Sequence, residues 1–573
     1  MIKVLERVGL GLGIFALGFA CSHAQAPLPA GGREIRGVVV SAKSGEPLAE
    51  AQLTLIRTKD RKQLAGTVAD AEGRFAFVNL GDGKFDLVAS HSGYVRAAFE
   101  EHPGGVSTAI VTGAGLVTTG LRFELAPLAT IYGTITEDSG DPVRMARLSL
   151  YRRDINRGTG KMVRAAATMA DPTGNFELSQ LIPGTYFACA FGVPWYTLQG
   201  RTANGTKQDP ATQSRLTALD VAYPATCYPD VTDPNAADAI AVAAGDRVEL
   251  NIVMHATPAL HLRLQSPDWD SKHPPQMPQL FTNIFGIPEQ TTQNIVVNNP
   301  PEPGDGSVSG PVTVEIAGVP PGQYDMELSA QNGDSARHMS VDAAAENASI
   351  DLSAATPMAA LAGKVSMANG GSLPAATVIW LRSRQGNEEA VTQVGADGSF
   401  TIQSVRPSEY DVMISAAGNL LAIVSLTARG SAVKGHVLSV GSKPIQLIAT
   451  VDGATATVNG VVKRNGVPKS GVFVILVPDD PQSGLDMWQP NQSDSDGSFN
   501  FLHVLPGAYT VAAIEEGWSL DWSRPDVIAP YRARGVKVTV TPRAKEVNLP
   551  DAVEAQPLKL PQSKMPDPAL PGK

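Results

Sequence analysis

The sequence is poor in cysteine, in aromatic residues and in long hydrophobic segments. It has three cysteines among 573 residues, and Phe, Trp and Tyr together make up 6% of the chain. Beyond the N-terminal region, no apolar run approaches the roughly 20 residues that a membrane-spanning helix needs. We therefore expect no integral membrane segment once the N-terminal region has been removed.

Positive charge is also scarce. Lys and Arg total 46 against 56 Asp and Glu, which gives a formal net charge of -10. Proteins that bind nucleic acid have a patch of basic residues as their electrostatic footprint. The basic residues of this chain do not gather into such a patch. The sequence therefore predicts that nucleic acid is not a partner.

Motifs for catalysis are missing as well. The nine histidines are scattered singly, and none lies in a His-x-x-Glu or His-Glu-x-x-His arrangement that would gather zinc ligands. No Gly-x-Ser-x-Gly pentapeptide offers a nucleophilic serine. The turn from Asp494 to Gly497 could bind calcium through its oxygen atoms, but its recurrence along the chain favours a structural role. We predict a protein that is not an enzyme and has no metal and no cofactor.

Residues 1–24 have the order of a secretory signal peptide. Two basic residues precede an apolar stretch from Val8 to Ala20, and small residues follow it. We predict cleavage after Ala24 and a periplasmic or secreted location. The alternative is lipidation of Cys21, which would tether the protein to a membrane.

Cleavage would leave Cys189 and Cys227 as the two remaining cysteines. Because an exported chain meets oxidising conditions, we predict that they form a disulfide bond. The alternative is two separate buried thiols. In the chain-entropy model, closing the loop between residues 189 and 227 stabilises the fold by about 4 kcal/mol.

What the sequence does contain is a repeat, and its first marker is an apolar strand with a central glycine. These glycines are Gly37, Gly133, Gly363 and Gly460. A turn of the Gly-x-Pro type then leads into a second strand whose apolar and polar residues alternate, as in Ala51–Leu55. Such alternation is typical of a strand with one buried face.

Two further markers follow in the four units that these glycines open, the second of them in variant form in two units. An acidic turn with glycine leads into an aromatic strand, as in Asp171-Pro172-Thr173-Gly174-Asn175-Phe176. A Pro-Gly turn then precedes Tyr or Phe, as in Pro183-Gly184-Thr185-Tyr186. Asp caps its own backbone and Gly takes positive φ, so both markers predict tight turns between strands. We expect the aromatic rings to anchor the core.

These motifs resemble the carboxypeptidase regulatory-like domain, a transthyretin-like sandwich found in tandem in exported bacterial proteins. The resemblance covers four units well and a degenerate third unit through Pro320-Pro321-Gly322-Gln323-Tyr324 alone. It implies an all-β chain of tandem immunoglobulin-like or transthyretin-like Greek-key β-sandwich modules. It also implies an accessory role without catalytic residues, and a related carbohydrate-binding-like fold keeps glycan binding open.

The markers divide the chain into five modules and a tail. The modules are residues 33–127, 128–256 with a long insertion, 257–355, 356–450 and 451–553. Within the degenerate third module we expect a long mobile loop over residues 266–310. We expect the Pro-rich residues 554–573 to be disordered.

Aromatic residues in the insertions are the candidate ligand-binding groups, because exposed rings stack on sugars or anchor a protein partner. They are Trp195, Tyr196, Tyr223, Tyr228, Trp518, Trp522 and Tyr531. The alternative is that these rings pack between modules.

The sequence thus predicts a non-catalytic protein that binds carbohydrate or an envelope or extracellular protein, in adhesion or as a scaffold. Two other functions stay open. One is an accessory part of a carboxypeptidase or hydrolase system. The other is a recognition module that works in trans with an outer-membrane transporter.

Overall fold

The computed structural model describes residues 32–559, apart from residues 103, 155, 198–217, 271–276, 292–293, 299–308, 330–335, 345–348, 481–482 and 485–486. The expected signal peptide and Cys21 lie outside these residues. The described chain is built mainly from short strands, which form a pair of sheets in each of the first four modules and one continuous sheet in the fifth. This confirms the predicted all-β class of tandem sandwich modules.

Module 1 pairs the sheet β4–β1–β8 with the sheet β3–β2–β5–β6, to which β7 adds beside β5. Its strands are β1 Arg33–Ser41, β2 Gln52–Arg57, β3 Lys62–Val68, β4 Arg74–Leu80, β5 Gly83–Ser90, β6 Ala97–Ala98, β7 Ile110–Thr112 and β8 Leu121–Leu125.

Module 2 pairs β12–β9–β17 with β11–β10–β13–β15, and β16 adds beside β13. A small ribbon of β14 and β18 lies at its junction with module 3. Its elements are β9 Ala129–Glu137, β10 Arg147–Arg153, β11 Met162–Met169, β12 Asn175–Leu181, β13 Gly184–Phe191, β14 Val221–Ala222, β15 Thr226–Cys227, the 3-10 helix η1 Pro234–Ala236, β16 Ile240–Val242, β17 Arg247–Met254 and β18 Thr257–Pro258.

Module 3 pairs β22–β23–β19–β26 with β21–β20–β24–β25–β27. Its elements are β19 Leu260–Asp270, β20 Pro278–Ile284, β21 Ile287–Gln290, β22 Asn294–Asn298, β23 Ser309–Val319, β24 Gly322–Leu328, β25 Arg337–Ala343, β26 Ser349–Ile350, η2 Leu352–Ala354 and β27 Thr356–Pro357. The expectation of one long loop over residues 266–310 was therefore wrong, because β20, β21 and β22 lie within it and complete both sheets. Its Pro, Gln and Asn content hid these strands.

Module 4 pairs β31–β28–β37–β34 with β30–β29–β32–β36–β35, and β33 adds beside β32. Its strands are β28 Ala359–Met367, β29 Thr377–Ser383, β30 Glu389–Gln393, β31 Ser399–Val405, β32 Ser408–Ala416, β33 Asn419–Leu420, β34 Ala422–Arg429, β35 Ala432–Lys434, β36 Val437–Val440 and β37 Ile445–Asp452.

Module 5 joins its strands into one continuous sheet, because β46 pairs with both β38 and β43. Its elements are β38 Ala456–Arg464, β39 Val467–Pro468, β40 Phe473–Pro478, β41 Gln489–Gln492, β42 Ser498–Val504, β43 Gly507–Ile514, η4 Gly517–Ser519, α2 Pro525–Arg532, β44 Val536–Val540, β45 Glu546–Asn548 and β46 Val553–Gln556. The prediction that disorder begins at residue 554 was wrong, since residues 554–556 belong to β46.

The opening glycine of the repeat is explained by a parallel strand pair. In modules 1, 2 and 4 the first strand pairs in parallel with a closing strand: β1 with β8, β9 with β17, and β28 with β37. A Cβ at Gly37, Gly133 or Gly363 would overlap the carbonyl oxygen of Leu121, Leu250 or Leu447, respectively. Glycine is required here for close approach of backbones.

In modules 2 to 5 the aromatic anchors are tyrosines with a recurring hydrogen bond. Tyr186, Tyr324, Tyr410 and Tyr509 are each buried, and each hydroxyl donates to the carbonyl oxygen four residues earlier in the chain, at 2.6–2.9 Å. The hydroxyl is thus satisfied inside the core, where an unpaired polar group would cost stability. The predicted core role of these rings is confirmed. The same hydrogen bond in module 3 shows that the degenerate unit keeps this tyrosine and its backbone partner.

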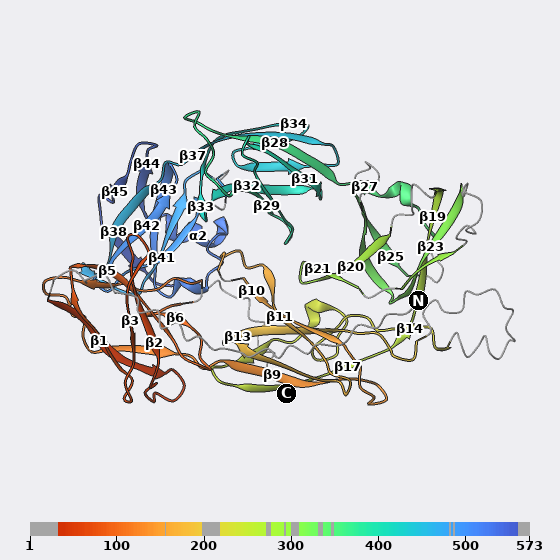
Figure 1. The fold of residues 1–573 in the computed structure, drawn as a ribbon, viewed down its shortest axis with the longest axis horizontal. Coiled ribbons are helices and arrows are strands. Elements are labelled where there is room, and N and C mark those ends of the chain that lie inside the picture. Colours follow the sequence, from red (N-terminus) through yellow and green to blue (C-terminus); the bar gives the residue numbers. More distant parts are fainter. Residues whose placement is uncertain are drawn as a thin grey trace, which may run out of the picture.

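The modules fold back on one another. Modules 1 and 2 lie in one row, modules 4 and 5 return along it, and module 3 stands at the turn (Figure 1). Module 1 contacts module 5 although they are farthest apart in the chain: Lys84 Nζ lies 2.5 Å from Asp494 Oδ2, and the Gln492 amide donates to Thr108 Oγ1 at 2.7 Å. Burial raises the pKa of Asp494 to about 6, against the opposing effect of Lys84.

Module 2 contacts the returning row as well. Lys161 Nζ donates to the carbonyl oxygens of Ser383 and Gly386 in module 4, at 3.0 and 2.6 Å. Arg153 pairs with Asp521 of module 5 at 2.6 Å. The loop between β10 and β11 therefore links three modules.

Candidate ligand-binding site

The predicted candidate aromatics of module 2 differ in exposure. Trp195 is 66% exposed, its ring lies edge-on to Tyr196, and the Arg144 guanidinium lies 5.8 Å from its ring centre. Tyr196 and Tyr223 both donate to Glu137 Oε2, at 3.1 and 2.6 Å. Burial is the main cause that raises the pKa of each tyrosine.

Tyr223 and Tyr228 belong to the body of module 2. Tyr223 is 6% exposed within its core, and Tyr228 is partly buried against that core. The bond between Tyr228 and Pro229 is cis. Of the four module 2 aromatics, Trp195 offers the most open ring.

Of the three candidate aromatics of module 5, two pack at its contacts with other modules, and Tyr531 is buried against its own module. Strand β40 is buried on both faces, and its outer face is covered by a cluster that includes Trp522 and Tyr531 at 5% and 1% exposure. Ser523 Oγ donates to the Gly158 carbonyl oxygen of module 2 at 2.9 Å, and the half-buried Trp518 ring stacks on His102 of module 1 with centres 3.5 Å apart. For Trp518 and Trp522 the structure thus matches the packing alternative.

The predicted disulfide between Cys189 and Cys227 is present. The two residues are cross-strand partners in β13 and β15, with Cα atoms 3.9 Å apart. Both side chains are fully buried on the outer face of the β10–β13 sheet. They lie beside Tyr151 of the same module and Ile284 of module 3. The bond therefore braces the face on which module 3 rests.

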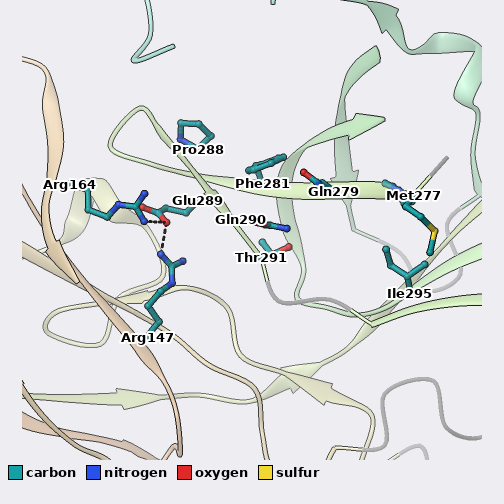
Figure 2. Close-up of a pocket in the computed structure, with 11 residues that line it drawn as sticks. Arg147, Arg164, Met277, Gln279, Phe281, Pro288, Glu289, Gln290, Thr291 and Ile295 are labelled. Carbon is teal, nitrogen blue, oxygen red and sulfur yellow. Dashed lines mark hydrogen bonds and ion pairs between the residues drawn. The ribbon is translucent and has the colours of Figure 1, made fainter. Parts of the chain in front are cut away.

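A pocket of about 780 Å³ opens at this junction of modules 2 and 3. Module 2 contributes Arg147 from β10 and Arg164 from β11. Module 3 contributes the hairpin of β20 and β21 and the residues beside it, namely Met277, Pro278, Gln279, Phe281, Pro288, Glu289, Gln290, Thr291 and Ile295. Figure 2 shows the two arginines at one end, with Phe281, Gln279 and Met277 along the β20 wall.

Glu289 holds the charged end of this pocket together. Its side chain is 2% exposed, and its Oε2 lies 2.7 Å from Arg147 Nη1 and 3.3 Å from Arg164 Nη1. Its Oε1 accepts a 2.9 Å hydrogen bond from the Tyr151 hydroxyl. A buried carboxylate needs such partners, because an uncompensated one would be costly. Burial raises the pKa of Tyr151, and the neighbouring Glu289 charge acts in the same direction.

The sequence did not indicate Arg147, Arg164 or Glu289. Along β10, Arg147, Ser149 and Tyr151 alternate with Leu148 and Leu150, which is the pattern of a strand with a solvent-facing side. The signal that could have found them is the large aromatic Tyr151 on that polar side. The charged pairing itself arises only because the module 3 hairpin covers β10.

The described residues lack two other features. No group of three or more His, Cys, Asp and Glu side chains there is arranged to hold a metal ion. No helix among them is long and apolar enough to cross a membrane.

Comparison with known protein families finds a match in the first module. The sequence pattern of the carboxypeptidase regulatory-like domain matches residues 34–114. No curated protein sequence matches the chain.

Matches among solved structures include the minor pilin GBS52 of Streptococcus agalactiae, at 12% identity over 42% of this chain and 100% of that one, with a TM-score of 0.21. The Bacillus anthracis TIE protein is 9% identical over 73% of this chain and 74% of that one, with a TM-score of 0.17. Scores this low assign no role to any residue here. Residues 34–114 are thus similar to the carboxypeptidase regulatory-like domain.

Proposed function

We propose that this chain is an exported, non-catalytic binding and scaffolding protein whose ligand is a carbohydrate or an envelope or extracellular protein. The observation that carries the proposal is the pocket between modules 2 and 3. Ligand sites often lie where domains meet. A buried carboxylate that holds two arginines in place also keeps the polar groups of such a site oriented before a ligand arrives.

The contacts between modules support the scaffolding part. Because module 2 touches modules 3, 4 and 5, the walls of the pocket are braced from several sides. The Cys189–Cys227 bond supports export, since disulfides persist in oxidising compartments and are rare in the cytosol. N-terminal sequencing of protein recovered from the envelope or the medium should place the cleavage after Ala24.

A glycan array and a pull-down from envelope extract test the binding function. We expect the wild-type protein to retain a glycan or protein that the double variant Arg147→Gln and Arg164→Gln does not retain. Arg122→Gln, an exposed substitution in module 1, is the control that should bind normally. If the wild-type protein binds nothing in either assay, the binding function is wrong. Release of a C-terminal amino acid by the purified protein, abolished by a chelator, would overturn its non-catalytic character.

A further inference from the structure

The charged end of the pocket between modules 2 and 3 carries an excess of positive charge. Two arginines line it, and Glu289 is the one acidic residue in the lining. A single carboxylate neutralises one of two guanidinium groups, so the described lining keeps a charge of about +1, because arginine stays protonated at any ordinary pH. This end of the pocket therefore favours an anion.

Arg164 is the residue that can meet such an anion. Its side chain is 47% exposed, and within the described chain it donates one long hydrogen bond, 3.3 Å to Glu289 Oε2. A guanidinium group has five N–H donors in a planar fork, and that fork matches the two oxygens of a carboxylate. Arg147 is less available, because it is 25% exposed and its guanidinium lies over the Phe191 ring at 4.3 Å.

The rest of the pocket presents side chains of a different kind. Gln279 and Gln290 are exposed amides, and Phe281 is a half-buried ring that faces Gln290 across the β20–β21 pair. Figure 2 shows Phe281 and Gln279 on the same wall, away from the arginines. Amides pair with hydroxyl groups, and an aromatic ring packs against the apolar face of a sugar ring.

The edges of β11 and β21 do not favour an extended peptide in this pocket. Peptides that add to a sheet need an open strand edge. Strands β11 and β21 are the edges of their sheets, and they lie beside each other at the junction. Between these two strands the pocket therefore offers side chains, and side chains suit a saccharide.

From these observations we propose that the pocket between modules 2 and 3 binds an acidic saccharide, with a sugar carboxylate on Arg164 and the sugar rings along Phe281, Gln279 and Gln290. The proposal rests on the proposed binding function and narrows it to saccharides that carry a carboxylate, such as uronic acids. A neutral sugar of the same shape lacks the group that Arg164 would hold.

Isothermal titration of the full mature chain with uronic acid oligosaccharides tests this. The probes are short galacturonate, mannuronate and glucuronate oligomers, each compared with its methyl ester, which keeps the rings and removes the charge. We expect the acids to bind about tenfold or more tightly than the esters, and Arg164→Gln to lose that preference, because a charge-assisted hydrogen bond contributes that much. Binding should also weaken as salt is added.

Two variants separate the pocket from a general effect. Gln279→Ala, at an exposed position on the other wall, should weaken acid and ester binding alike. Arg122→Gln in module 1 should change neither. Equal binding of acid and ester, or an unchanged acid preference in Arg164→Gln, would overturn the inference and leave saccharide binding standing. If neutral glycans or proteins bind and none of the acids does, the inference is wrong but the proposed binding function stands. If the protein binds no ligand of any kind, the proposed function is wrong as well.

Discussion

At the residue scale, His261 is held between two carboxylates at the junction of modules 2 and 3. Its Nε2 lies 2.6 Å from Asp220 Oδ2, and its Nδ1 lies 2.6 Å from Glu315 Oε1. The ring is 15% exposed. An imidazole donates from both nitrogens only when it is protonated. Asp220 directly precedes β14 of module 2, and Glu315 lies on β23, so the charged ring ties this part of module 2 to module 3.

We expect His261 to make this junction pH-dependent. Burial lowers the pKa of His261, but the bonds to Asp220 and Glu315 outweigh it, so the net pKa lies above the ordinary 6.5. Because the folded state binds the proton more tightly, the stability that His261 contributes is fully present below 6.5 and is lost as the pH rises through the raised pKa. An NMR titration of the histidine ring protons measures that pKa directly.

The variant His261→Gln should therefore destabilise the protein more at mildly acidic than at alkaline pH. His503→Gln, at an exposed position, is the control and should cost little at either pH. An equal loss of stability from His261→Gln at both pH values would contradict a role for the charged ring.

At the element scale, the central glycine of the opening strand decides whether the parallel pair can form. In module 4, β28 lies between β31 and β37, and Gly363 faces Leu447 across the parallel pair. A Cβ at this position would also crowd the Phe400 ring. The neighbours are a backbone carbonyl and a core side chain, so neither can move without disturbing the sheet.

We expect Gly363→Ala to destabilise module 4 by about 2 kcal/mol or more, as overpacking in a core does. Gly441→Ala is the matched control in the same module, because a Cβ there meets no atom within 4 Å. Hydrogen exchange of the β28 and β37 amides measures the effect within the intact chain. Equal protection in the two variants would show that the parallel pair tolerates a side chain.

At the scale of the whole molecule, modules 1 and 5 stabilise each other across the two rows (Figure 1). Val106 of module 1 joins the apolar cluster on the outer face of module 5, and His102 stacks on Trp518. Asp494 Oδ1 also accepts a hydrogen bond from the Ala109 backbone. Contacts of this kind transmit a change in one module to the stability of the other.

The variant Trp518→Ala should therefore weaken module 1 although it lies in module 5. We expect a loss of about 1 kcal/mol, the typical value of an aromatic pair beyond simple burial, seen as faster hydrogen exchange in β5 and β7. Trp195→Ala removes an exposed ring from module 2 and should leave module 1 unchanged. If Trp518→Ala alters exchange in module 5 alone, the two modules fold independently.

Local chemistry determined a large part of this protein directly from its sequence. The markers around Gly37, Asp171 and Tyr186 fixed strands, turns and core anchors, because turn geometry and side-chain alternation act over a few residues. The disulfide bond could also be predicted from the sequence, because only two cysteines remain after the expected cleavage and each can pair only with the other. The Pro, Gln and Asn-rich strands of module 3 were missed, because tertiary pairing overrode a composition that is typical of loops.

The candidate pocket, by contrast, was decided by tertiary structure alone. Arg147, Arg164 and Glu289 come from two modules, and their outward strand faces look solvent-exposed in the sequence. Alternation shows which face of a strand is polar, but it does not show whether another module will cover that face. The same holds for Trp518 and Trp522, whose rings are covered by modules 1 and 2. The sequence determined an all-β chain of tandem sandwich modules and the aromatic anchors of their cores, and the packing of one module on another decided which polar residues meet.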